Sequence, residues 1–215
     1  MDKIQLPNKE LRVINTQMEL REDGDKEKIG GYGIRYNELS EPIMGLSKEK
    51  IAPGAADNAI KNSDIRSLFN HDPNYVLGRK KAGTLNIYED EIGVRYEADP
   101  PDKQWANDLK KNIARGDIDG SSFIFSVAED GDEWDDSGDI PIRTITEFEE
   151  IIDIGPVTFP AYPTATSGVR SNLNVRSAEE IYNQHLKNKG AAPEEIAKRK
   201  KALRKVKYSN IKLEV

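Results

Sequence analysis

Apolar and polar residues alternate along several short stretches of the chain, a two-residue period typical of strands with one buried face. The alternation occurs at 32–36, from Ile65 to Asn70, and at 122–127. Two further stretches, 83–88 and 92–97, flank a polar turn and predict a hairpin. The middle of the chain is therefore expected to be rich in β-structure.

The second half of the chain holds two more apolar stretches, 143–149 and 151–159, which also predict strands. The second of them contains Gly155-Pro156. A glycine followed by a proline inside a strand indicates a bulge or a sheet edge.

Helical spacing appears once within the body of the chain. Trp105, Ala106, Leu109 and Ile113 fall on one face of a helix that Gly116 ends, and a short helix is also predicted at 55–60. Many short strands with few helices predict a β-rich α+β fold. We expect a small, closed or partly closed antiparallel β-barrel with flanking helices.

The composition narrows the class of protein. A chain of 215 residues with 36% hydrophobic and 33% charged residues supports one domain with a modest core and a heavily solvated surface. No apolar run approaches the roughly 20 residues of a membrane span, and the N-terminus lacks a signal-peptide pattern, so a cytoplasmic location is expected. The chain has no cysteine and two distant histidines. This argues against disulfides, thiolate nucleophiles and metal sites, and no cofactor is predicted.

Charge divides the chain into an acidic body and a basic tail. Residues 178–215 contain 10 Lys and Arg against 5 Glu, so the net charge of -6 leaves -11 for residues 1–177. Residues 1–28 are polar and are expected to be irregular. The predicted organisation is a polar N-terminal segment at 1–28, a domain at 29–177 and a basic helical tail at 178–215.

The tail has the signals of two helices. Ser177 to Glu180 form a capping box for a first helix that runs to about Asn188, and Pro193 begins a second. We expect a targeting or assembly segment that binds acidic protein surfaces. Nucleic acid is a weaker alternative, because Tyr208 is the one aromatic residue among the tail's later basic positions. His185, in the first helix, is expected at the surface.

An acidic run at 129–139 carries seven carboxylates and no base. Charge of one sign without periodicity is typical of a solvated surface loop. Binding of a cation or of a basic peptide are the alternatives. An EF-hand is excluded, because the run lacks a regular ligand series ending in Glu.

Two residues are candidates for chemistry. His71 follows an apolar strand at a turn, and Ser122 lies where a glycine-containing turn leads into an alternating strand. A serine hydroxyl is a poor nucleophile until a base accepts its proton, and histidine, with an ordinary pKa of about 6.5, suits that task. If the fold brings them together, the chain is a serine hydrolase. The missing Gly-x-Ser-x-Gly elbow argues against an esterase of the α/β-hydrolase type.

Several motifs in one order resemble the prohead, or capsid maturation, serine proteases of tailed bacteriophages. They are Asn70-His-Asp-Pro, Val76-Leu-Gly-Arg79, Arg115-Gly-Asp-Ile-x-Gly-x-Ser122-Phe and Val157-Thr-Phe-Pro-Ala-Tyr162, within a resemblance that spans about residues 30–170. The family is thought to share its barrel with the herpesvirus capsid assembly proteases. The resemblance therefore implies both a fold and an activity.

The resemblance also implies roles for three residues. His71 matches the general base, Ser122 the nucleophile, and Asp153 the third position, where a Glu is usual; the serine usual two positions later is Gly155. Ser121 is the rival nucleophile, but alternation places it on the opposite face of the strand.

Other assignments stay open. Three acids are alternatives for the third member: Asp72, Glu149 and Glu150. Backbone N–H groups in a turn at Gly120-Ser121 are the nearest oxyanion donors, with Arg115 or Arg143 as possible helpers.

The implied function is that of a serine endopeptidase that cleaves scaffold or major capsid protein segments inside an immature prohead in the host cytoplasm. Self-cleavage that removes the tail, and a homo-oligomer within the prohead, are further implications; no membrane partner is expected. The alternative is a non-catalytic capsid-assembly or scaffold module with the same fold.

Overall fold

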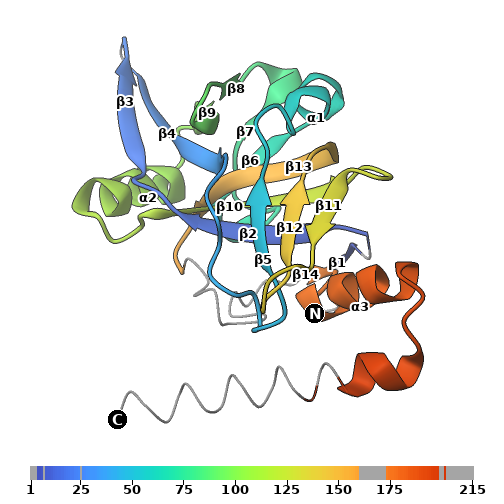
Figure 1. Cartoon of the computed structure of the whole chain (residues 1–215). Coiled ribbons are helices and arrows are strands. Elements are labelled where there is room, and N and C mark those ends of the chain that lie inside the picture. The colour runs from blue at the N-terminus through green and yellow to red at the C-terminus, as the bar shows by residue number, and fades with distance from the viewer. Residues whose placement is uncertain (1–3, 7, 25, 160–172, 199–200, 202–215) are drawn as a thin grey trace, which may run out of the picture.

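The structure is a computed structural model that describes residues 4–6, 8–24, 26–159, 173–198 and 201 (Figure 1). Its strands pair into four sheets, and helices lie at the periphery. The five-stranded sheet has the order β2 (Glu10–Asn15), β10 (Gly120–Val127), β13 (Phe148–Val157), β6 (Arg66–Leu68), β7 (Val76–Arg79). The four-stranded sheet has the order β3 (Glu19–Asp23), β4 (Lys26–Arg35), β9 (Gly93–Ala98), β8 (Leu85–Glu89).

The remaining elements are smaller. A three-stranded sheet has the order β11 (Asp132–Asp135), β12 (Ile142–Ile145), β5 (Lys48–Ile51), and β1 (Ile4–Leu6) pairs with β14 (Leu173–Val175). The helices are α1 (Asp57–Asn62), α2 (Gln104–Arg115) and α3 (Ala178–Asn188), with short 3₁₀ turns at η1 (Phe69–His71) and η2 (Lys80–Ala82). Residues 193–198 are also helical.

The core lies between the five-stranded and four-stranded sheets. One face of β10 contributes Phe123 and Phe125, whose rings stack 5.0 Å apart, and Phe148 of β13 packs edge-on against Phe125 at 4.8 Å. The sheets approach so closely that a Cβ at Gly33 would clash with the side chain of Ile154. This packing fixes β10 and β13 side by side at the centre of the molecule.

Much of the predicted β-rich α+β fold is confirmed. The hairpin is β8–β9, and the helix predicted from one apolar face is α2, which ends at Gly116 with a left-handed φ of 81°. The described strands pair as four separate sheets, and their hydrogen bonds do not form one closed ring. β13 has two bulges, one between Ile151 and Asp153 and one between Phe148 and Glu150, so Gly155-Pro156 continues the strand instead of interrupting it.

The polarity of the N-terminal segment predicted irregular structure, and this prediction is wrong. β2 pairs with β10 in the five-stranded sheet, and β3 pairs with β4. The polar residues Glu10 and Arg12 obscured the pattern because each is neutralised by a partner brought from elsewhere in the chain. Charged residues on β3 fit its position at a sheet edge. The proposed boundary at residue 28 is not marked by a change in secondary structure.

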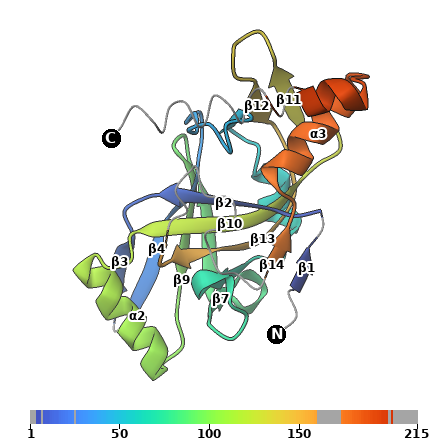
Figure 2. The same ribbon diagram turned by 90° about the horizontal axis from the view of Figure 1, so that it is seen from below.

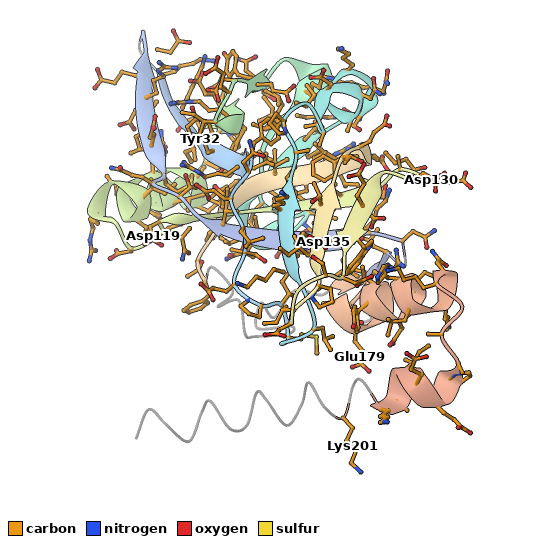
Figure 3. The ribbon with its side chains drawn as sticks, viewed as in Figure 1. Tyr32, Asp119, Asp130, Asp135, Glu179 and Lys201 are labelled. Carbon is orange, nitrogen blue, oxygen red and sulfur yellow. The ribbon has the colours of Figure 1, made fainter. Side chains whose placement is uncertain are left out.

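The acidic run and the tail also differ from expectation. Residues 132–135 of the run form β11, and α3 packs beside it (Figures 1 and 2). His185 is 8% exposed, not at the surface, because its ring stacks on Trp134 at 4.1 Å and bonds Asp136. The capping box at Ser177 is confirmed. In Figure 3, Asp130 at one end of the run extends away from the body, as does Lys201 of the tail.

Within the described residues, no helix has the length and apolar character needed to cross a membrane.

Candidate active site

Three elements that are far apart in the sequence bring together the side chains predicted from it. Ser122 lies in β10, Asp153 lies in the neighbouring β13, and His71 ends the 3₁₀ turn η1 that follows β6. β13 is flanked by β10 on one side and β6 on the other, so the serine, the carboxylate and the histidine loop converge on one face.

Hydrogen bonds join the three side chains in a line. His71 Nε2 lies 2.7 Å from Ser122 Oγ, and His71 Nδ1 lies 2.6 Å from Asp153 Oδ2. The other carboxylate oxygen of Asp153 accepts the backbone N–H of Leu68 at 3.0 Å. Asp153 is thereby held by the strand that leads to the histidine, and it is aligned with the imidazole.

The histidine is presented by an unusual backbone. Asn70 and His71 both have left-handed conformations, with φ of 56° and 57°, which is uncommon outside glycine but tolerated best by Asn, Asp and His. The Asn70 side chain donates to Thr158 Oγ1 at 3.0 Å and accepts the Thr158 N–H at 2.9 Å. These bonds tie the loop to the end of β13 and offset its strain.

The site is dry. Ser122 is fully buried, Asp153 is 1% exposed and His71 is 3% exposed. Burial raises the pKa of Asp153; the charge and hydrogen bond of His71, together with backbone N–H groups, oppose that rise. His71 is consequently the main group that stabilises the buried negative charge of Asp153.

The aspartate reaches the histidine although it is one methylene shorter than the acid usual in the resembled family. Gly155, two residues further along β13, lies directly against the β6 backbone, where a Cβ would clash with the carbonyl of Leu68. The absence of a side chain at Gly155 lets β6 lie close to β13. This approach is consistent with the shorter acid at Asp153.

The two adjacent serines occupy different environments, as alternation predicted. Ser121 Oγ faces the core, 3.0 Å from the Tyr96 hydroxyl and 3.2 Å from Met18 Sδ. Ser122 alone of the pair contacts the imidazole. Gly120 and Ser121 belong to β10, so the predicted turn at these two residues is wrong.

The other candidate groups have partners elsewhere. The Asp72 carboxylate accepts bonds from Asn74, while Glu149 accepts from Ser126 and Glu150 pairs with Lys9. Arg115 is exposed and pairs with Asp117. Arg143 is buried among carboxylates. Within the described part of the chain, none of these groups forms a hydrogen bond or ion pair with His71 or Ser122.

Three features of the site had no sequence prediction. They are the Leu68 N–H on Asp153, the Asn70–Thr158 clamp, and the backbone carbonyl of Arg12, which accepts a hydrogen bond from Ser122 Oγ at 2.9 Å. An asparagine just before the histidine could have suggested a left-handed turn. Backbone donors and acceptors carry no sequence signal.

A hydroxyl, an imidazole and a carboxylate joined in this way form the arrangement of serine hydrolases. The family model described as Caudovirus prohead serine protease matches residues 16–180. This match covers more than half of the chain. The chain therefore belongs to the Caudovirus prohead serine protease family, whose members act in capsid maturation.

Two individual proteins are similar to this chain. The prohead protease of Enterobacteria phage HK97 is 29% identical over 176 residues, which are 80% of this chain and 72% of that protein. The bacteriophage T4 capsid assembly protease gp21 matches with a TM-score of 0.46 and 13% identity over 70% of this chain and 98% of its own.

Proposed function

We propose that the chain is a serine endopeptidase that cleaves scaffold or major capsid protein segments inside an immature prohead in the host cytoplasm. Ser122 is the nucleophile, His71 the general base and Asp153 the residue that orients the base. The observation that carries this proposal is the continuous line from Asp153 through His71 to Ser122, with both contacts under 3 Å.

The three hydrogen-bonded side chains can carry out the proton transfers that peptide cleavage requires. The Nδ1–H of His71 donates a hydrogen bond to Asp153, which leaves Nε2 unprotonated and able to accept the Ser122 proton as Oγ attacks a peptide carbonyl. The imidazolium then forms next to a carboxylate that stabilises it, and it returns the proton to the leaving amine. Water repeats the sequence to release the acyl group. Because Arg115 and Arg143 are engaged elsewhere, we assign the oxyanion to backbone N–H groups beside Ser122.

The remaining parts of the proposal rest on the family resemblance. We propose the domain at 29–177 as the protease, with its sheets as a partly closed barrel of the herpesvirus-protease type; the close approach at Gly33 supports such curling. The segment 178–215 serves assembly or targeting and is a candidate for self-cleavage. In that segment, α3 is docked on β11 through His185.

Co-expression with the capsid protein tests the function. The Ser122→Ala variant is expected to leave the capsid protein uncut, whereas its neighbour variant Ser121→Ala, which alters a serine outside the hydrogen-bonded line, keeps processing it. Mass spectrometry of the capsid protein gives the readout. Normal processing by Ser122→Ala would show that the nucleophile lies elsewhere or that the chain is a non-catalytic assembly module.

A further inference from the structure

The strand that carries Ser122 has an occupied edge. β2 is the outermost strand of the five-stranded sheet and runs antiparallel to β10 (Figure 2). Its Val13 lies opposite Ser122, and its Arg12 lies opposite Phe123. An edge strand is held by backbone bonds on one side only, and the side chains from Leu11 to Ile14 are not fully buried.

β2 places a peptide carbonyl at the reactive hydroxyl. Ser122 Oγ donates to the Arg12 carbonyl oxygen at 2.9 Å. A serine hydroxyl has one proton to donate, so this bond competes with donation to His71 Nε2. A substrate carbonyl would have to approach Oγ to about 3–3.5 Å, in a region where Ser122 has no exposed surface. With β2 in place, the Ser122 hydroxyl is covered, and its proton can be donated to the Arg12 carbonyl instead of to His71.

The Arg12 side chain is held in a charged recess. Its guanidinium forms a bidentate pair with Glu49 at 2.7 and 2.8 Å, and it also contacts Glu10 of its own strand at 2.8 Å. Glu49 further pairs with Arg143 at 3.1 Å, and Arg143 pairs with Asp132 at 2.6 Å. The recess therefore combines residues from β2 with residues that belong to β5, β11 and β12.

Departure of β2 would remove one acid and one base, so the net charge of the recess would stay the same, but Glu49 would lose its bidentate guanidinium partner. Glu10 and Arg12 would leave with the strand, and Arg143 would remain with two carboxylates, Glu49 and Asp132. One negative charge would then lack a partner at the place of the Arg12 guanidinium. An incoming arginine or lysine side chain would take the place of the Arg12 guanidinium beside Glu49, whereas a glutamate would add repulsion in a buried setting.

We propose that β2 occupies the place of the substrate. A substrate peptide binds as an extended strand antiparallel to β10, its carbonyl at Ser122 and the basic side chain of the same residue on Glu49, after β2 has left this edge. This inference rests on the proposed role of Ser122. It makes residues 10–15 an internal occupant, so each molecule reacts only while β2 is displaced, and the free enzyme works at a reduced but measurable rate.

A reversible cross-link between β2 and β10 tests the displacement. Leu11 and Ile124 lie directly opposite each other, and paired strand positions have Cα separations compatible with a disulfide. The chain has no native cysteine, so the double variant Leu11→Cys, Ile124→Cys forms one defined bond. The matched control is Glu22→Cys, Glu27→Cys, an opposed and exposed pair on β3 and β4.

The readouts are labelling of Ser122 by a fluorophosphonate and cleavage of a peptide. We expect oxidation of the β2–β10 pair to slow both at least tenfold, reduction to restore them, and oxidation of the control pair to change neither. Equal rates in the oxidised and reduced β2–β10 variant would overturn the inference while leaving Ser122 as the nucleophile. Failure of every form, wild type included, to label would overturn the proposed function and this inference with it.

A peptide series tests the recess. Peptides that differ only in the residue before the cut are compared with Arg, Lys, norleucine or Glu at that position. We expect kcat/KM for Arg and Lys to exceed that for Glu at least tenfold, and Glu49→Gln to narrow the ratio. A preference for Glu, or a ratio unchanged by Glu49→Gln, would overturn the basic specificity.

Discussion

Two buried carboxylates near β10 respond to burial in opposite ways. Asp153 is 1% exposed and its pKa is raised; Glu49 is 6% exposed and its pKa is lowered. Burial pushes both pKa values upward, but at Glu49 the charges and hydrogen bonds of Arg12 and Arg143 outweigh it. At Asp153 the opposing groups are one imidazole and backbone N–H groups, and burial prevails.

The difference separates a structural carboxylate from a reactive one. Guanidinium groups keep their charge at all ordinary pH values, so Glu49 has permanent partners. His71 changes its charge during the proposed reaction, so Asp153 is fully compensated only when the imidazole is protonated. Asp153 gains a charged partner when His71 takes up the serine proton, and it thereby stabilises the imidazolium. An incompletely compensated carboxylate can serve catalysis in this way.

The largest expected effect comes from Asp153→Asn. The amide would present a donor to His71 Nδ1 and favour the tautomer with the proton on Nε2, which cannot accept from Ser122. We expect kcat/KM for peptide cleavage to fall by about 10⁴-fold, as in serine protease triads. The control is Asp72→Asn, which alters a carboxylate that accepts its hydrogen bonds from Asn74 and should stay near wild type.

Stability should not follow activity in this variant. A raised pKa in the folded state means that the contribution of Asp153 to stability is present at low pH and is lost as pH rises through the raised pKa. Asparagine cannot ionise, so the unfolding midpoint of Asp153→Asn at pH 8 should equal or exceed that of wild type. A large loss of stability in Asp153→Asn at pH 8 would show that Asp153 stabilises the fold as Glu49 does. The proposed difference between the two carboxylates would then be wrong.

The contrast between these carboxylates could not be predicted from the sequence. Motif resemblance proposed His71, Ser122 and Asp153, and alternation separated Ser121 from Ser122. Neither approach concerns what surrounds a residue in space. Glu49 and Arg143 are 94 residues apart along the chain, and their pairing follows from strand order, which periodicity does not encode.

The elements themselves were predictable where one face is apolar. The spacing in α2 and the alternation around Phe123 are such cases. β2 and β11 were missed because charged residues take inward positions in them, and partners on other strands neutralise those charges. His185 was misplaced for the same reason, since Trp134 lies in a run whose composition is typical of a solvated loop.

A second, smaller effect is expected from Glu49→Gln. Removing one partner of a buried ion pair leaves uncompensated charge, which costs about 3–5 kcal/mol of unfolding free energy. The lowered pKa of Glu49 means that its contribution is present above the usual pKa of glutamate and is lost as pH falls through the lowered value. The difference in unfolding free energy between wild type and Glu49→Gln should therefore become smaller at acidic pH.

Urea unfolding at neutral and at acidic pH measures that difference, with Glu22→Gln on exposed β3 as the matched control. Glu22 should change stability little at either pH. A difference for Glu49→Gln that stays constant as pH falls would show that packing, and not charge, carries the contribution of this residue.

The smallest effect is expected from Asp136→Asn, which removes the charge of a partly exposed carboxylate. Burial raises the pKa of Asp136, but hydrogen bonds from Lys189 and His185 outweigh it and the pKa is lowered. The side chain is 22% exposed and Lys189 is 55% exposed, so water and salt screen the interaction. We expect a loss of about 0.2–1 kcal/mol that shrinks at high salt, measured by urea unfolding against Asp130→Asn. A loss as large as that of Glu49→Gln would mean that partner charge alone, and not burial, decides what a carboxylate contributes in this fold.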